Sequence, residues 1–241
     1  MSEILHKNNS RGLADHGWLV SRHTFSFANY HNPERMNFGL LRVLNDDIVT
    51  PSMGFGTHPH ENMEIVSIPL VGSLKHQDSM GNKHTISAGE VQIMSAGSGL
   101  THSEYNNSDE VDVNFLQIWV FPKKKNISPR YGQLFFDAAD RKNRFQILVS
   151  PQDSDETIWI NQDAWFSMAD IEPGKQIRYE KQNKDNGVYF FVIEGEAEID
   201  GHSVEQRDGL GLPHGEIHPV RAETDVQLLA IEVPMSQSHG L

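Results

Sequence analysis

The stretch Gly56-Thr57-His58-Pro59-His60 carries the strongest structural signal in the sequence. A proline disfavours helical backbone at the residue before it, so His58 is expected to be extended. Residues two apart on an extended strand point to the same side. We therefore expect the side chains of His58 and His60 to lie together on one face of a β-strand.

A second pair with the same spacing follows downstream, where His102 and Glu104 are two residues apart. Glu64 lies an even number of residues after His58 and His60, a relation that we call the same parity, so on a continuous strand it would share their face. One inward histidine alone is more often a hydrogen-bonded core residue than a ligand. Several histidines and carboxylates that converge inside a barrel would be buried without enough hydrogen-bond partners. Such burial costs free energy unless a cation is bound among them. The pattern predicts a metal site of three histidines and one glutamate, and parity does not separate the two glutamates.

Composition limits the metal and the partners. The chain has 241 residues and no cysteine, which excludes disulfides, thiolate ligands and cysteine nucleophiles. Nitrogen and oxygen ligands admit Fe(II), Mn, Ni, Co, Cu or Zn. A net charge of -13 repels nucleic acid phosphates and anionic lipids. The run Lys123 to Lys125 is too short to reverse this charge and is expected to solvate a loop.

No targeting or membrane segment is evident. Residues 1–17 contain no apolar core of a signal peptide. No stretch approaches the roughly 20 apolar residues of a membrane span. We therefore expect a cytoplasmic protein that binds neither membranes nor nucleic acid directly. We also expect a monomer, because no long apolar surface strand stands out.

Outside the histidine motif, strand signals dominate and long helical periodicity is nearly absent. Turn sequences such as Asn45-Asp46-Asp47 and Asp200-Gly201 separate the runs, and a short helix is expected around residues 136–142. Many short strands between turns are typical of a β-barrel or sandwich, including jelly rolls. The expected strands are Gly39–Val43, Glu64–Leu70, Val91–Met94, Val113–Phe121, Gln146–Val149, Val188–Ile193, Ala197–Ile199 and Val226–Val233.

The two halves of the chain repeat one order of elements. Each half has a strand ending in glycine, a hairpin, a short turn and a final histidine segment, at an offset of about 120 residues. This predicts an all-β protein of two similar barrels, residues 1–125 and 126–241. The second half lacks a His-x-His motif. His214, Glu216 and His218 share parity, but side chains along one strand diverge, so we expect the second barrel to be degenerate and metal-free.

These segments resemble a known family. His58-Pro59-His60, Glu64 and Gly72 are similar to the first cupin motif, and Gly99, His102 and Asn106 to the second. The N-terminal segments 16–19 and 23–30 resemble the pirin branch, most closely the bacterial pirin-like quercetin 2,3-dioxygenases. The resemblance implies a bicupin fold, which is two jelly-roll β-barrels in tandem, with a single metal ion in the N-terminal barrel. It also implies cleavage of flavonols such as quercetin by O2, with release of carbon monoxide.

The resemblance further implies roles for the two glutamates. Ordinary cupins use the glutamate of the first motif, here Glu64, whereas pirins use the one after the last histidine, here Glu104. We therefore expect His58, His60, His102 and Glu104 to bind one divalent transition metal ion, with Fe(II) expected first. Either Glu104 or Glu64 could accept the proton of a flavonol hydroxyl as the catalytic base.

Two other functions stay open. Pirins elsewhere act as metal-dependent transcriptional cofactors, so a regulatory binding protein or stress protein is one alternative. Another small-molecule enzyme on the same scaffold is the second, because one fold hosts many chemistries. His76 and Asp78 are expected to be structural residues at a hairpin. Trp18, Phe25 and Phe27 could cover the first barrel, and ordinary packing in the core is the expectation that we retain. Four apolar side chains could form a cleft for a planar polyphenol: Met36, Phe38, Phe55 and Met63.

Overall fold

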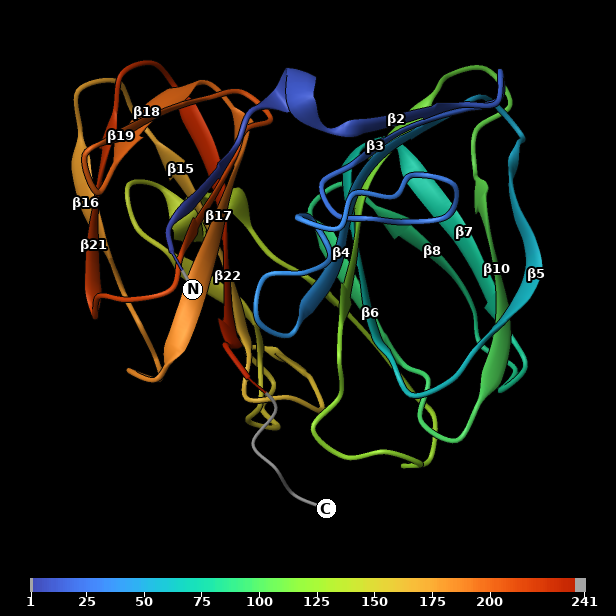
Figure 1. Cartoon of the computed structure of the whole chain (residues 1–241). Helices are drawn as coiled ribbons and strands as arrows, with labels where there is room; N and C mark the ends of the chain where they lie inside the picture. Colours follow the sequence, from blue (N-terminus) through green and yellow to red (C-terminus); the bar gives the residue numbers. More distant parts are fainter. Residues whose placement is uncertain (1, 237–241) are drawn as a thin grey trace.

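The computed structural model describes residues 2–236 and shows two β-barrels side by side (Figure 1). Helical structure in this part of the chain is limited to two 3-10 turns, η1 (Asn8–Ser10) and η2 (Ala138–Arg141). The second of these lies within the short helix expected around residues 136–142. No helix among the described residues is long and apolar enough to cross a membrane.

The first barrel consists of two antiparallel sheets. A seven-stranded sheet has the order β12-β9-β6-β11-β4-β3-β2, and a four-stranded sheet has the order β5-β10-β7-β8. Some neighbours in these sheets, such as β4 with β11 and β5 with β10, are distant in sequence, as in a jelly roll. The bounds are β2 Gly12–Asp15, β3 Leu19–His23, β4 Leu41–Val49, β5 Gly54–His60, β6 Glu64–Val71, β7 Ser73–Asp78, β8 Lys83–Ser87, β9 Glu90–Ser95, β10 Leu100–Asn106, β11 Val113–Val120 and β12 Arg130–Phe135.

The second barrel repeats this plan with sheets of seven and four strands, in the orders β1-β20-β17-β22-β15-β13-β14 and β16-β21-β18-β19. The expected all-β fold of two tandem barrels is therefore confirmed. The bounds are β1 Ile4–His6, β13 Gln146–Ser150, β14 Ile158–Trp159, β15 Trp165–Ile171, β16 Gln176–Glu180, β17 Asn186–Glu194, β18 Glu196–Ile199, β19 His202–Glu205, β20 Gly209–Leu212, β21 Ile217–Ala222 and β22 Val226–Pro234.

Strand pairing links the two halves of the chain. β1 leaves the N-terminal half and pairs with β20, at the edge of the second barrel's large sheet (Figure 1). β12, which follows residue 126, pairs with β9 of the first barrel. The division of the chain between residues 125 and 126 stays a prediction, and each half contributes a strand to the other's sheet.

The turn expected at Asn45-Asp46-Asp47 is wrong, because β4 runs straight through these residues. The carboxylates of Asp46 and Asp47 have partners inside the fold, which removes the need for a solvent-exposed turn. Asp46 forms ion pairs with Arg11 at 3.4 Å and Arg207 at 3.0 Å. Asp47 accepts a hydrogen bond from Ser21 on the neighbouring strand.

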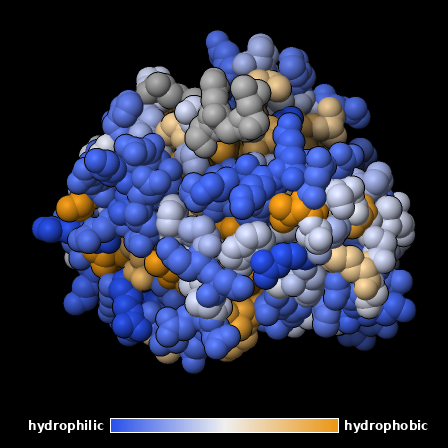
Figure 2. Space-filling view, turned by 90° about the horizontal axis from the view of Figure 1, so that it is seen from below, coloured by the Kyte–Doolittle hydropathy of each residue, from blue (hydrophilic) through white to orange (hydrophobic). Residues whose placement is uncertain are grey.

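The main core lies between the two seven-stranded sheets. Val66 and Ile118 of the first barrel share it with Phe166 and Leu229 of the second. Because strand residues alternate in direction, Ser67 of β6 faces the interior of the first barrel instead. The face of the molecule in Figure 2 is largely hydrophilic with small separate apolar patches, in keeping with the net charge of -13.

Candidate metal centre

Three histidines meet on two adjacent strands of the first barrel. In the register of β5 with β10, His58 lies opposite His102, and His60 lies opposite Leu100. The ring centroids are 4.4 Å apart for His58 and His102, 4.8 Å for His58 and His60, and 4.9 Å for His60 and His102. One nitrogen of each ring lies within 4.8 Å of the others. The shared face expected for these histidines is therefore present.

The hydrogen bonding of these rings leaves lone pairs free. His58 Nδ1 is 2.8 Å from the carbonyl oxygen of Gly56. A carbonyl only accepts, so Nδ1 carries the hydrogen, and in the neutral ring Nε2 keeps its lone pair. His102 is buried, and neither of its ring nitrogens has a hydrogen-bond partner among residues 2–236. A buried unpartnered imidazole is costly, and a bound cation would compensate for it.

The protonation states suit metal binding. Burial, helped by the neighbouring His102 and His58, lowers the pKa of His60 to about 4. Burial, then His58 and His76, lowers the pKa of His102 to about 3. Both imidazoles are therefore neutral near pH 7, and the neutral ring is the form that binds a metal ion.

Glu104 lies on β10 two residues after His102 and is fully buried. The large sheet holds its carboxylate in place. Gln117 Nε2 donates to Glu104 Oε2 at 2.7 Å, and Ser67 Oγ lies 3.1 Å from Glu104 Oε1. Ser67 and Gln117 are themselves a cross-strand pair of β6 and β11. Sequence reasoning missed both residues, although each is a polar interruption in an apolar run.

His76, His102 and Glu104 form a second group with ligand atoms close together. Both nitrogens of His76 are already engaged, because Nε2 lies 3.2 Å from Asp78 Oδ2 and Nδ1 lies 3.3 Å from Gln92 Nε2. Asp78 also accepts hydrogen bonds from two amides of the following turn, as expected for a hairpin residue. The ring nitrogens with free lone pairs are therefore those of His58, His60 and His102. His76 lies next to His102, with a ring centroid distance of 5.5 Å.

Known proteins share this arrangement of two barrels. The sequence pattern of the pirin family matches residues 6–120, and that of the quercetinase C-terminal cupin domain matches residues 147–233. A protein of Escherichia coli strain K12 named quercetin 2,3-dioxygenase is 43% identical over 234 residues, which is 95% of this chain and 98% of that protein. The chain belongs to the pirin family.

Solved structures agree with this membership. The bacterial pirin YhhW of Escherichia coli in complex with nickel(II) superposes with a TM-score of 0.91 at 39% identity, covering 97% of this chain and 99% of that one. A quercetin 2,3-dioxygenase from Acinetobacter baumannii has a TM-score of 0.78 at 19% identity, covering 95% of this chain and 85% of that one. At that identity the likeness shows the bicupin fold alone.

The pirin fold does not bring Glu64 to the histidines. Glu64 Oε2 accepts hydrogen bonds from Ser95 Oγ at 2.7 Å and from the amide of Asn161, in the second half of the chain, at 3.1 Å. Residues 61–63 separate β5 from β6, and Asn62 has a φ of 49°. The alternation of side-chain direction along β5 is therefore not continued in β6. The expectation that Glu64 shares a face with His58 is therefore wrong. Burial raises the pKa of Glu64 to about 7.

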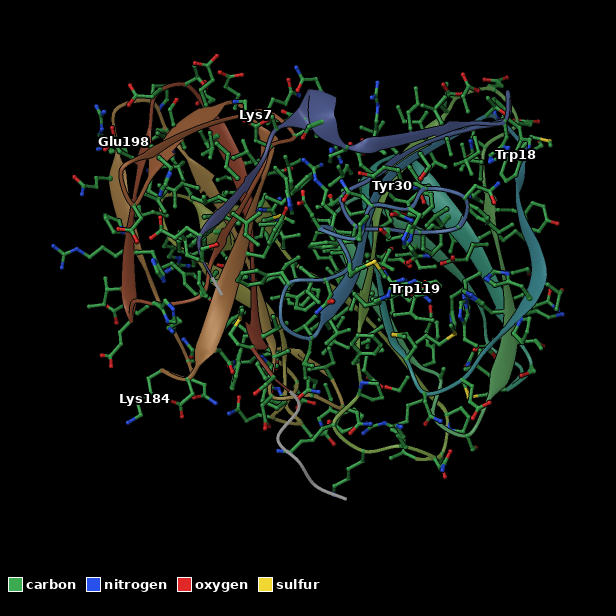
Figure 3. All side chains as sticks on the ribbon, in the orientation of Figure 1. Lys7, Trp18, Tyr30, Trp119, Lys184 and Glu198 are labelled. Carbon is green, nitrogen blue, oxygen red and sulfur yellow. The ribbon has the colours of Figure 1, made fainter. Side chains whose placement is uncertain are left out.

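Aromatic side chains border His60. Its ring meets Trp119 edge-on, with the ring centroids 5.0 Å apart. Trp119 in turn contacts Phe27 of the N-terminal segment at 5.2 Å. Met63 packs in the same small cluster as Trp119. This side of the site is therefore apolar, and Trp119 lies within the body of the first barrel (Figure 3).

The other apolar residues singled out in the sequence lie elsewhere. Phe25 and Phe38 are buried in the core between the barrels, so the expectation that Phe38 lines a cleft at the site is wrong. Phe55 packs against Trp18 with a centroid distance of 5.4 Å. Met36 is partly exposed.

The corresponding position of the second barrel holds His218. This buried ring bonds to Asp200 through Nδ1 at 2.9 Å. The surrounding interior is apolar, with Tyr179, Phe190 and Leu228 in one cluster. Among residues 2–236, the groups of histidines and carboxylates close enough to share an ion are the two that contain His102.

Proposed function

We propose that this chain is a metal-dependent dioxygenase that cleaves flavonols such as quercetin. The reaction consumes a flavonol and O2 and yields a ring-opened ester and carbon monoxide, so it needs no further oxidant or reductant. The observation that carries the proposal is the group of His58, His60 and His102, whose ring nitrogens lie within 4.8 Å of one another. The naming of the relative that is 43% identical supports the choice of reaction.

We propose that one divalent ion is held by His58, His60, His102 and Glu104, where a carboxylate oxygen of Glu104 lies within 4.8 Å of a ring nitrogen of His102. Imidazole and carboxylate ligands suit Fe(II) as well as Ni, Co, Cu, Mn or Zn. We propose Fe(II), since sets of histidines with a carboxylate are common in non-haem iron oxygenases. When bound, the ion would act as a Lewis acid and as a template for the substrate.

The chain's own residues would prepare the site. The Gly56 carbonyl fixes the ring of His58 so that Nε2 faces away from that bond. Ser67 and Gln117 orient the carboxylate of Glu104. From that position Glu104 would accept the proton of the flavonol 3-hydroxyl.

Substrate would approach along β5, the edge strand of the small sheet. His58 and His60 are half-buried rather than enclosed. The apolar surface of Trp119 beside His60, with Met63 in the same small cluster as Trp119, suits a planar polyphenol, because such ligands need apolar contact with a few polar anchors.

Metal analysis combined with turnover tests the proposal. Protein purified without chelator should contain a single divalent ion per chain, consume O2 with quercetin and release carbon monoxide. His58→Ala and Glu104→Gln should lower metal affinity by more than about 100-fold, beyond the effect of losing a residue that only orients a ligand. His16→Ala removes an exposed histidine outside the site and should behave as wild type.

Loss of metal binding and loss of turnover would contradict different parts of the proposal. Wild-type protein that holds no metal would overturn the metal site. Metal-loaded protein that neither consumes O2 nor releases carbon monoxide with quercetin would overturn the flavonol reaction and leave the metal site standing.

A further inference from the structure

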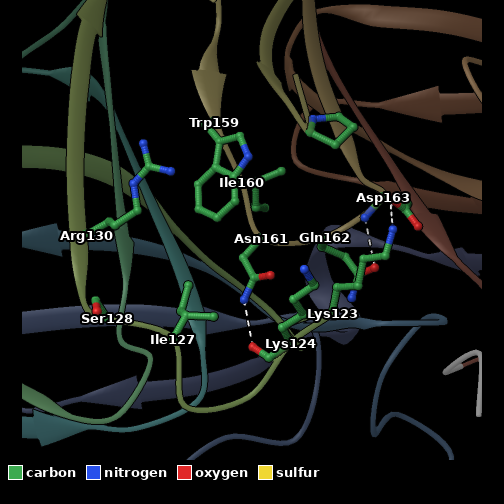
Figure 4. A pocket seen from close by; sticks show the side chains of 11 residues that line it. Lys123, Lys124, Ile127, Ser128, Arg130, Trp159, Ile160, Asn161, Gln162 and Asp163 are labelled. Carbon is green, nitrogen blue, oxygen red and sulfur yellow. Dashed lines mark hydrogen bonds and ion pairs between the residues drawn. The ribbon is translucent and has the colours of Figure 1, made fainter. Parts of the chain in front are cut away.

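We infer that a pocket between the two barrels binds a small planar aromatic carboxylate, separately from the histidine cluster. The pocket has a volume of about 390 Å³ and lies where the loop after β11 meets the segment around β14 (Figure 4). It shares no residue with the histidine cluster. Its walls include Lys124, Ile127, Arg130, Trp159 and Ile160.

The size and the walls suit an aromatic ring. Sites for small molecules commonly have volumes of about 300–1,000 Å³ and mainly apolar walls. Trp159 borders the hollow on one side and Ile127 on the other in Figure 4, with Ile160 beside the indole. Trp159 is half-buried, so part of its ring is available for stacking.

The charges suit an anion. Lys124 Nζ makes no hydrogen bond or ion pair with residues 2–236. The Arg130 guanidinium lies 4.2 Å from the centroid of the Trp159 ring and forms a long, exposed ion pair with Asp153 at 4.0 Å. Lys123 is neutralised by Asp163 at 2.7 Å. Two cations therefore flank an apolar pocket in a chain with a net charge of -13, and a guanidinium can bind a carboxylate through two hydrogen bonds.

The pocket is held open by internal hydrogen bonds. Asn161 Nδ2 donates to the carbonyl of Lys124 at 2.7 Å, and Gln162 Nε2 donates to the carbonyl of Phe121 at 2.7 Å. The amide of Asn161 donates to Glu64 in the first barrel. Because these contacts fix both loops in advance, little conformational entropy opposes binding. The lysine run expected only to solvate a loop thus also lines a pocket.

Calorimetric titration of the full, chelator-treated chain with 2-naphthoate tests this inference. We expect one molecule bound per chain. Lys124→Ala and Arg130→Gln should each weaken binding by about tenfold, as should replacing the probe with neutral naphthalene-2-carboxamide. Lys184→Ala removes an exposed lysine of the second barrel (Figure 3) and should leave binding unchanged.

Binding of 2-naphthoate in this pocket does not depend on the proposed dioxygenase reaction. His58→Ala should bind 2-naphthoate as wild type does, and Lys124→Ala should consume O2 with quercetin as wild type does. Lys124 is exposed, so this variant should fold even if Arg130→Gln disturbs Trp159. Absence of binding, equal binding of the carboxamide, or binding unaffected by both pocket variants would overturn the inference.

Discussion

Individual hydrogen bonds define the candidate site at the scale of the residue. The carbonyl of Gly56 selects the tautomer of His58, and the pair Ser67 and Gln117 fixes the carboxylate of Glu104. Within the part of the chain that the structure describes, His102 has no such partner, which leaves both of its nitrogens unsatisfied. These local differences separate ring nitrogens that are free to bind an ion from those, as in His76, that are not.

The substitution Gln117→Leu tests whether Gln117 fixes the orientation of the Glu104 carboxylate. The variant has a similar volume but loses the amide that donates to Glu104 at 2.7 Å. Metal affinity should fall by about 10- to 100-fold, as for other residues that orient ligands. The free energy of unfolding should fall by about 1–3 kcal/mol, because a buried carboxylate loses a donor. Metal titration and urea unfolding measure the two effects.

The matched control is Gln77→Leu on the exposed face of β7, which should change neither value. If Gln117→Leu bound metal as tightly as wild type, Gln117 would have no orienting role.

Glu64 gives a prediction on pH dependence. Burial raises the pKa of Glu64 to about 7 from an ordinary 4.5. Between these values the folded chain binds more protons than the unfolded chain, so stability from this group falls as pH rises from 4.5 to 7. Glu64→Gln should therefore raise the free energy of unfolding at pH 8 by about 2–3 kcal/mol and give no gain at pH 4.

Denaturant unfolding of both proteins at the two pH values measures this difference. Glu180→Gln, at an exposed carboxylate, should show no such pH dependence. A Glu64→Gln effect of equal size at pH 4 and pH 8 would contradict the raised pKa.

At the scale of the element, the fit of β5 on β10 brings the three histidines together. The register shifts by one residue between His102 and Glu104, so that Glu104 pairs with Phe55. Such a bulge bends the strand and re-aims its side chains. Gly54 lies at the tight end of this contact, where a Cβ would be 2.2 Å from the carbonyl oxygen of Glu104.

Gly54→Ala should therefore push β5 away from β10. We expect a loss of about 1–3 kcal/mol in unfolding free energy, as for other overpacked sites, and weaker metal binding. Gly56→Ala is the matched control in the same strand, because its Cβ would meet nothing closer than 3.7 Å. Thermal unfolding and metal titration of the pair measure the difference. Equal behaviour of the two variants would show that close packing at Gly54 does not hold the site.

At the scale of the whole molecule, the shared core makes the two barrels one folding unit. Phe166 of β15 is buried among residues of both barrels, whereas Phe190 of β17 is buried inside the second barrel alone. β1 and β12 each pair with a strand of the other half of the chain. The ion pair of Asp46 with Arg207 also joins the two barrels. We expect a single cooperative unfolding transition, because neither large sheet is covered without the other.

Phe166→Ala and Phe190→Ala test this coupling with the same change of side chain. Each should cost about 3–5 kcal/mol. Hydrogen exchange should become faster in β6 for Phe166→Ala, because that strand faces the shared core, and less so for Phe190→Ala. Calorimetry that resolved two separate transitions in the wild type would contradict the coupling.

The sequence by itself determined the features that depend on local geometry. Alternation along a strand predicted that His58 and His60 share a face. The repeated order of elements predicted two barrels, and the near absence of helical periodicity predicted little helix. Such features depend on near neighbours in the chain, which the sequence shows directly. The choice of Glu104 came from resemblance to a family rather than from parity, and its role as a ligand stays a prediction.

Only the tertiary structure decided the features that depend on distant partners. The loop at residues 61–63 turned Glu64 towards Asn161 of the other half. Pairing of β6 with β11 placed Ser67 beside Gln117, under a carboxylate of a third strand. Strand exchange at β1 and β12 likewise follows from pairing between remote segments. The register and neighbours of a strand are set by contacts across the whole fold, which a local pattern does not contain.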